Sequence, residues 1–133
     1  MNQKDLVLDF NLYLCERYGY KDSCHVSPTE NGCCICVRER DIKFYIRFWE
    51  YSKGVNGFPD WCIIIVSCEF SGEQKEKLFD LIQFLKEYAP QYGFQNLAVE
   101  DELSNIGEML GLKRIDSPLY IKNYLAKLDE IEV

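Results

Sequence analysis

The chain lacks a long apolar run. None of its hydrophobic stretches approaches the roughly 20 residues that a membrane-spanning helix needs. Its first residues include Lys4, Asp5 and Asp9 among the apolar ones. They lack the basic start and the small-residue cleavage site of a signal peptide. We therefore expect a cytoplasmic protein with no membrane partner.

An excess of basic charge is also missing. The 22 acidic residues outnumber the 15 lysines and arginines, so the net charge is −7 and the isoelectric point is about 4.7. Non-specific binding of nucleic acid depends on basic side chains that displace counterions. The composition therefore argues against a nucleic-acid partner and permits a basic protein partner.

Histidine is nearly absent, because His25 is the only one. A hydrolase that relies on a histidine base would have this residue alone to use. It belongs to a cluster of possible zinc ligands: Cys24, His25, Cys33, Cys34 and Cys36. The cluster lacks the paired cysteine or histidine knuckles of a structural zinc site, so we expect no metal. We expect instead a loop histidine and strand cysteines that pack as small apolar side chains.

Seven cysteines are many for 133 residues, and their odd number would leave one unpaired if the others formed disulfides. Because no export signal is visible, we expect reduced thiols. The composition is 47% hydrophobic and 14% aromatic, which is typical of a globular protein. The length fits one domain over residues 1–133.

A strand, a helix, a second strand and a short helix are predicted over residues 61–112. Residues 61–68 are nearly all apolar, as in a strand that is buried on both faces. Ser71 and Gln74 have the spacing of a capping box, which predicts that a helix begins there. The apolar face of that helix consists of Leu78, Leu81, Ile82, Leu85 and Tyr88.

This helix is expected to end at Pro90 and Gly93, before a second strand over residues 94–99. We expect Asp101 to cap the short helix that follows, and Gly111 to end it in the left-handed conformation. A buried strand, a crossover helix and a second strand form a right-handed βαβ unit by default. The two strands should therefore be parallel.

The remaining segments complete the predicted domain. An amphipathic helix is expected over residues 3–18, a polar loop over 21–32, a hairpin over 33–51 and a surface loop over 52–60. The C-terminal segment, residues 118–133, leaves two alternatives open.

In that segment, Ser117 and Pro118 would fit the start of a helix. We favour a strand near 119–124 with a helical or frayed tail. The whole pattern predicts a single α/β (α+β) domain, in which helices lie on the faces of a mixed, mostly antiparallel sheet.

The order of these elements over roughly residues 33–124 resembles that of the GCN5-related N-acetyltransferase (GNAT) family. One local match is the junction of strand and helix at residues 68–78. Another is the run 105–112, which looks like the short helix of that family, with Leu112 in place of an aromatic residue. The resemblance implies a GNAT-like fold.

In that family, the turn between strand and helix carries the motif Gln/Arg-x-x-Gly-x-Gly/Ala, and its backbone N–H groups hold the pyrophosphate of CoA. Aligning Gly72 with the first glycine puts Glu69 at the Gln/Arg position and Gln74 at the second small position, so only Gly72 matches. The resemblance implies that acetyl-CoA or another acyl-CoA would bind at Ser71, Gly72, Glu73, Gln74 and Lys75.

The activity that the resemblance implies is acyl transfer to an amine. A carboxylate near Glu100, or a water, would accept the amine proton, since Glu100 follows the carboxyl end of a strand. The acidic run 100–102 also fits a helix cap with solvated carboxylates. The tyrosine with which the family often protonates the leaving thiolate corresponds to about Gly107. Tyr120 or Tyr124 would then have to take its role.

A second hypothesis is a non-enzymatic acidic module, such as an inhibitor, immunity or phage-type accessory protein, that binds a basic protein partner. Its contacts would come from the aromatic region 45–61, which contains Tyr45, Trp49, Tyr51, Phe58 and Trp61. The two hypotheses differ at residues 72–75. Backbone N–H groups that face an open cleft would favour ligand binding, and side chains that fill the cleft would favour the binding module.

Overall fold

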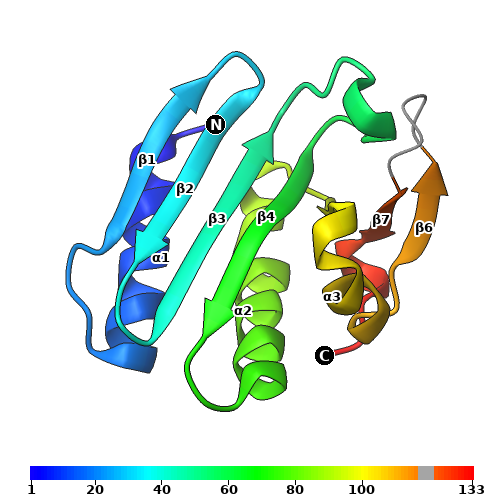
Figure 1. The fold of residues 1–133 in the computed structure, drawn as a ribbon. Helices are drawn as coiled ribbons and strands as arrows, with labels where there is room; N and C mark the ends of the chain where they lie inside the picture. Colours follow the sequence, from blue (N-terminus) through cyan, green and yellow to red (C-terminus); the bar gives the residue numbers. More distant parts are fainter. Residues whose placement is uncertain (117–121) are drawn as a thin grey trace.

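A mixed sheet of seven strands runs through the computed structural model, which describes residues 1–116 and 122–133 (Figure 1). The strands are β1 (Cys24–Thr29), β2 (Gly32–Arg38), β3 (Ile42–Trp49), β4 (Cys62–Phe70), β5 (Asn96–Val99), β6 (Lys113–Asp116) and β7 (Lys122–Lys127). Their order across the sheet is β1-β2-β3-β4-β5-β7-β6. All neighbouring pairs are antiparallel except β4 and β5, which are parallel. The chain is a single domain of mixed α/β structure with a mostly antiparallel sheet, as expected.

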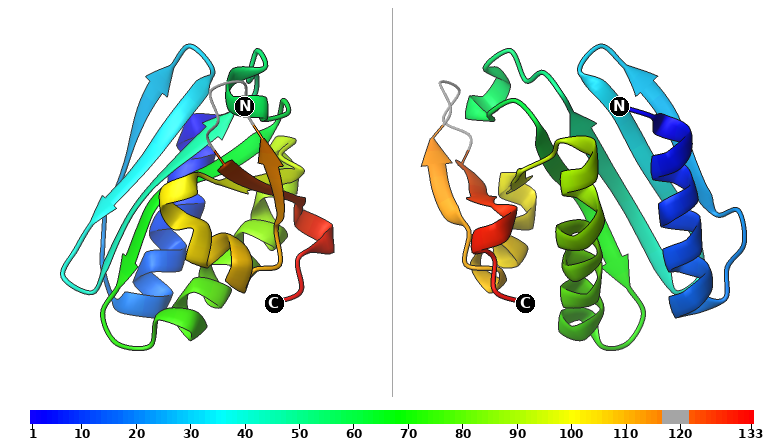
Figure 2. Two further views of the ribbon diagram at one scale, coloured as in Figure 1. Left: turned by 45° about the vertical axis from the view of Figure 1, so that its right-hand side comes forward. Right: turned by 180° about the vertical axis from the view of Figure 1, so that it is seen from behind.

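Two long helices cover one face of this sheet. α1 (Gln3–Tyr18) and α2 (Gln74–Tyr88) lie behind it in Figure 1 and come forward in the right-hand view of Figure 2. The main core includes the fully buried side chains of Phe10, Phe44, Phe48, Leu81 and Phe94. A short helix, α3 (Ser104–Met109), packs beside β5 and β7. No helix in the described part of the chain combines the length and the apolar character that crossing a membrane requires.

α1 coincides with the helix expected over residues 3–18. The side chain of Asn2 caps it by accepting hydrogen bonds from the N–H groups of Lys4 and Asp5. Gly19 ends it with a φ of 75°, in the left-handed region that glycine adopts without strain. Its buried face consists of Leu6, Phe10, Tyr13 and Leu14.

The prediction of a loop over residues 21–32 is wrong, because β1 lies within it. β1 is an edge strand that pairs with β2, and most of its side chains are exposed. Pro28 has no N–H to donate, and an edge strand is a place where a proline is tolerated. The sequence did not predict this strand because it is polar and contains a proline. β2 and β3 form the hairpin expected over residues 33–51.

β4, α2 and β5 form the parallel βαβ unit expected from the sequence. β4 is buried on both faces only in its first half, Cys62–Ile65, and beyond this point half-buried and exposed side chains alternate up to the buried Phe70. The register with β3 shifts at the same place, which makes Val66 the extra residue of a β-bulge. The bulge lies next to the point at which β5 stops pairing.

The predicted capping box at the start of α2 is wrong. Glu73 precedes the first helical residue, and no side chain caps the helix. The hydroxyl of Ser71 donates instead to the carbonyl oxygen of Arg40 at 3.2 Å. At its other end α2 runs into a 3-10 turn that contains Pro90, and Gly93 follows with a φ of 97°.

The predicted cap at Asp101 is also wrong, because α3 begins after Leu103 and has no side-chain cap. Gly111 follows the helix with a φ of 71°, as expected. The sequence did not predict β6. β7 extends beyond the strand expected near residues 119–124, of which 119–121 lie outside the described residues.

Candidate functional site

The sheet changes from antiparallel to parallel pairing at β4. Residues Cys62–Ile65 of β4 pair with the whole of β5. β4 then continues to Phe70, paired with β3 alone among the described strands, so the two parallel strands part before the chain reaches α2. In open α/β sheets, ligands bind at the carboxyl ends of strands at such switch points. The turn from β4 to α2, which contains Ser71–Lys75, is therefore the candidate site.

This turn is attached to the tip of the β2–β3 hairpin. The N–H of Ser71 donates to the carbonyl oxygen of Asp41 at 2.9 Å. Gly72 has a φ of 82°, and a Cβ added to it would lie 3.6 Å from the Nζ of Lys77. A glycine is the residue that holds this left-handed conformation without strain. A hollow of about 100 Å³ lies between the turn and the hairpin tip.

The first turn of α2 has no side-chain cap, so it presents free N–H groups at the positive end of the helix dipole. The charges around it are mixed. The Nζ of Lys75 lies 5.5 Å from the ring centroid of Phe79. A hydrogen bond with Glu73, and then the charge of Glu73, raise the pKa of the exposed Glu76 carboxyl. An anion at this helix start would therefore meet charges of both signs.

Two side chains bond to backbone groups of the same turn. The side-chain oxygen of Gln74 accepts a hydrogen bond from the N–H of Phe70 at 3.3 Å, and its amide donates to the carbonyl oxygen of Phe70. Gln74 thus binds the backbone of β4 where β5 no longer reaches. The amine of Lys77 donates to the carbonyl oxygen of Ser71. The turn is therefore partly occupied by its own side chains.

Glu100 and Tyr124 both lie near the end of β5, but their side chains make separate contacts. Glu100 follows the strand directly, and its Oε1 accepts a hydrogen bond from Nη1 of Arg47 at 3.0 Å in an ion pair. Tyr124 of β7 lies opposite the last residue of β5. Its ring packs against Gly107 of α3, where an added Cβ would lie 2.6 Å from the Cγ of the tyrosine. Tyr120 lies outside the described residues.

The aromatic region 45–61 is largely buried. Trp49 and Phe58 pack edge to face with ring centroids 6.3 Å apart. They belong to a second, smaller core with Cys62, Ile64 and Ala98. Tyr51 is 56% exposed. It is the aromatic side chain of this region that is most open to a partner.

His25 lies on β1, directly opposite Cys36 of β2, and not in a loop as expected. All seven cysteines are free thiols. Burial raises the pKa to about 12 for the thiols of Cys24, Cys33, Cys62 and Cys68. These thiols therefore act as small apolar groups. No group of three or more His, Cys, Asp or Glu in residues 1–116 and 122–133 is arranged to hold a metal ion.

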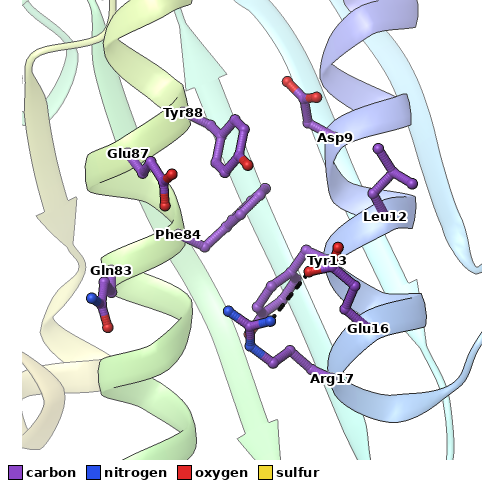
Figure 3. A pocket seen from close by; sticks show the side chains of 9 residues that line it. All are labelled: Asp9, Leu12, Tyr13, Glu16, Arg17, Gln83, Phe84, Glu87 and Tyr88. Atoms are coloured by element: carbon purple, nitrogen blue, oxygen red, sulfur yellow. Dashed lines mark hydrogen bonds and ion pairs between the residues drawn. The ribbon is translucent and has the colours of Figure 1, made fainter.

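A second concave surface, which sequence reasoning missed, lies between α1 and α2. We call it the α1–α2 groove. Its volume is about 350 Å³, and Figure 3 shows the nine side chains that line it: Asp9, Leu12, Tyr13, Glu16, Arg17, Gln83, Phe84, Glu87 and Tyr88. Asp9 and Glu16 are two turns apart on α1, and Gln83 and Glu87 are one turn apart on α2. Each helix thus has a polar row that the sequence shows, but only the fold places the two rows side by side.

Comparisons with known proteins add little to this geometry. No protein-family model matches the chain, and no curated protein matches it at a significant level. Among solved structures, the chain is similar to a CoA-dependent acyl-homoserine lactone synthase, MesI. The TM-score is 0.40 and the identity 11%, over 94% of this chain and 82% of that one. A likeness at this level carries no argument about function. The arrangement of strands and helices is itself that of a single mixed α/β domain, consistent with a GNAT-like fold.

Proposed function

We propose that the chain is a divergent GNAT-like protein that binds an acyl-CoA, or a related ligand, at residues 71–75. One observation carries the proposal. α2 begins without a side-chain cap at the carboxyl end of β4, beyond the point at which β4 and β5 part. Free N–H groups and the positive end of the helix dipole attract a pyrophosphate. Gly72 permits a close approach of the backbone, and Lys75 and Lys77 supply positive charge.

Acyl transfer to an amine is the reaction that we propose for this site. The amine nitrogen would attack the thioester carbonyl, so that a C–N bond forms and the C–S bond breaks. Glu100, or a water, would accept the proton that the amine loses, and the ion pair with Arg47 would hold that carboxylate in position. The CoA thiolate would take a proton from a tyrosine.

Tyr124 is the first candidate for this tyrosine. Its ring fills the space beside Gly107, the position at which the short helix of GNAT proteins often has its own tyrosine. The fold thus supports Tyr124 as a replacement that comes from β7 instead of α3. Tyr120 stays a second candidate on the sequence alone.

Calorimetric titration with CoA and with acetyl-CoA, in reducing buffer at low salt, tests the proposal. We expect binding in the micromolar range or tighter, and a matching rise in the melting temperature. Lys75→Glu should weaken binding about ten-fold, because it puts a negative charge beside the helix start. Lys4→Glu makes the same change of charge at the start of α1 and should alter the affinity by less than about two-fold. No heat and no thermal stabilisation at millimolar CoA would overturn the proposal.

The alternative function is a non-enzymatic acidic module that binds a basic protein partner. The side chains of Gln74 and Lys77 favour it, because they already bond to the backbone of the turn that CoA would use. In the region 45–61, the exposed side chain of Tyr51 would contact the partner. The CoA titration separates the two functions, since the module predicts no effect of the cofactor.

A further inference from the structure

The α1–α2 groove has an aromatic floor. Phe84 stacks on Tyr13, with ring centroids 4.6 Å apart and an angle of 20° between the rings, and tilts against Tyr88 at 5.0 Å. Figure 3 shows the rings of Phe84 and Tyr88 lying between the two helices. The faces of aromatic rings carry partial negative charge and attract cations. Tyr13 and Phe84 are buried, so the half-buried Tyr88 is the ring of the three that a positively charged group with an apolar stem can reach.

The rim of the groove is acidic on both sides. Asp9 and Glu16 come from α1 and Glu87 from α2, while Arg17 is the one cation among the described residues that line the groove. The hydroxyl of Tyr92 donates a hydrogen bond to Asp9 and so fixes the position of its carboxylate. Three carboxylates against one guanidinium, in a chain of net charge −7, favour a cationic occupant.

One end of the groove already holds a cation. The guanidinium carbon of Arg17 lies 5.6 Å from the ring centroid of Tyr13. Its Nε is 2.9 Å from Oδ2 of Asp80, and its Nη1 is 3.3 Å from Oε2 of Glu16. The chain thus supplies its own example of a guanidinium held between an aromatic ring and carboxylates.

The other end of the groove has the same components without the cation. Figure 3 shows Asp9, Glu87 and Tyr88 toward this end, and no second lysine or arginine lines the groove within the described residues. Beside it, Leu8 and Leu12 are 57% and 54% exposed, one turn apart on α1. A small free amine would leave both leucines in water, whereas a polypeptide would cover them.

We propose that the α1–α2 groove binds a basic segment of a protein partner. An arginine or lysine side chain of that segment enters between Asp9, Glu87 and Tyr88, and the rest of the segment covers Leu8 and Leu12. The groove lies about ten residues along α2 from the turn proposed for CoA, which corresponds to roughly 15 Å of helix. Peptide binding and CoA binding are therefore measured separately, and the failure of one leaves the other standing.

The test is a calorimetric titration with a short capped peptide of alternating glycine and arginine. A second peptide with citrulline in place of arginine keeps the shape and removes the charge. We expect the arginine peptide to bind at least about ten-fold more tightly than the citrulline peptide. Equal affinities for the two peptides, or no binding of either at low salt, would contradict the proposal.

Matched variants separate this groove from general attraction to an acidic protein. The double variant Asp9→Asn, Glu87→Gln should weaken arginine-peptide binding about ten-fold. Glu30→Gln, Glu132→Gln removes the same charge from two exposed residues elsewhere and should weaken it by less than about two-fold. Tyr88→Leu removes a ring face without a change of charge and should weaken it two- to about five-fold. Equal losses in the two double variants would overturn the proposal.

A measurement on the unmodified protein guards against variants that do not fold. In a nitrogen-edited NMR titration with the arginine peptide, we expect the largest amide shifts at residues 8–16 and 83–88. Shifts spread evenly over the acidic surface, or centred on residues 45–61, would also overturn the proposal. The second of these patterns would place the basic partner on the region around Tyr51.

Discussion

At the scale of single residues, Gly107 shows how the fold near the end of β5 depends on one missing side chain. The residue is buried in the middle of α3, where glycine is a poor helix former. Its value lies in the space it leaves, because the Cβ and the ring of Tyr124 occupy the positions that a side chain would need. The glycine thereby allows β7 and α3 to pack closely near the end of β5.

Gly107→Ala should therefore destabilise the protein. The added Cβ would lie 2.6 Å from Cγ and 2.9 Å from Cβ of Tyr124. We expect a loss of about 1–2 kcal/mol in urea unfolding, since overpacking outweighs the gain in helix propensity. In a Tyr124→Ala background the same substitution should be neutral or stabilising. An unchanged urea midpoint for the single variant would show that Tyr124 moves aside at no cost.

At the scale of elements, the junction of β4 and α2 depends on a side chain whose role the sequence misassigns. The spacing of Ser71 and Gln74 is that of a capping box, and Gln74 does reach back as such a residue should. Its side chain does not bond to Ser71, however, but to the backbone N–H and carbonyl oxygen of Phe70. The reason is that β5 ends early, so the edge of β4 has groups that need a partner.

Gln74→Ala should cost about 1 kcal/mol in the free energy of unfolding, because it leaves a partly buried N–H and carbonyl without these bonds. The amide of Phe70 should also exchange faster with solvent deuterium. Gln83→Ala is a matched change at an exposed position of the same helix and should alter stability by less than about 0.5 kcal/mol. Similar losses for both variants would assign the effect to helix propensity instead.

Short elements show where sequence patterns stop being informative. β1 and β6 were not predicted. β1 is polar, contains Pro28 and has one strand neighbour, so its side chains do not alternate clearly between apolar and polar. β6 has only four residues, too few to establish a period. The long segments α1, β3 and α2 were predictable because each buries one regular face.

At the scale of the whole molecule, buried thiols couple stability to alkaline pH. Burial raises the pKa of Cys24, Cys33, Cys62 and Cys68 from the ordinary value of 9.0 to about 12. Between these values the unfolded chain releases thiol protons that the folded chain keeps. The folded state then binds more protons, so the free energy of unfolding falls as the pH rises. This contribution to stability is fully present below pH 9 and is lost toward pH 12.

We therefore expect the urea midpoint, in reducing buffer, to fall steadily between pH 8.5 and pH 11. Each buried thiol should contribute roughly 1 kcal/mol per pH unit in this range. Cys62→Ala should make the decline less steep, whatever it does to stability at neutral pH. Cys15→Ser, at an exposed position, should leave the slope unchanged. A pH-independent midpoint would show that these thiols ionise as readily in the folded state as in the unfolded one.

The sequence alone was enough to predict the elements that bury a regular face, the parallel pairing of β4 and β5, and a mixed, mostly antiparallel sheet. The resemblance to GNAT proteins named the turn after β4 as a ligand site, and that site stays a prediction. Only the tertiary structure decided what bonds to that turn and what packs against Gly107, because residue spacing does not specify such hydrogen bonds and contacts. The α1–α2 groove likewise exists only after folding, when rows of residues about 70 positions apart lie side by side. Periodicity records which face of one element is buried, but a site belongs to several elements at once.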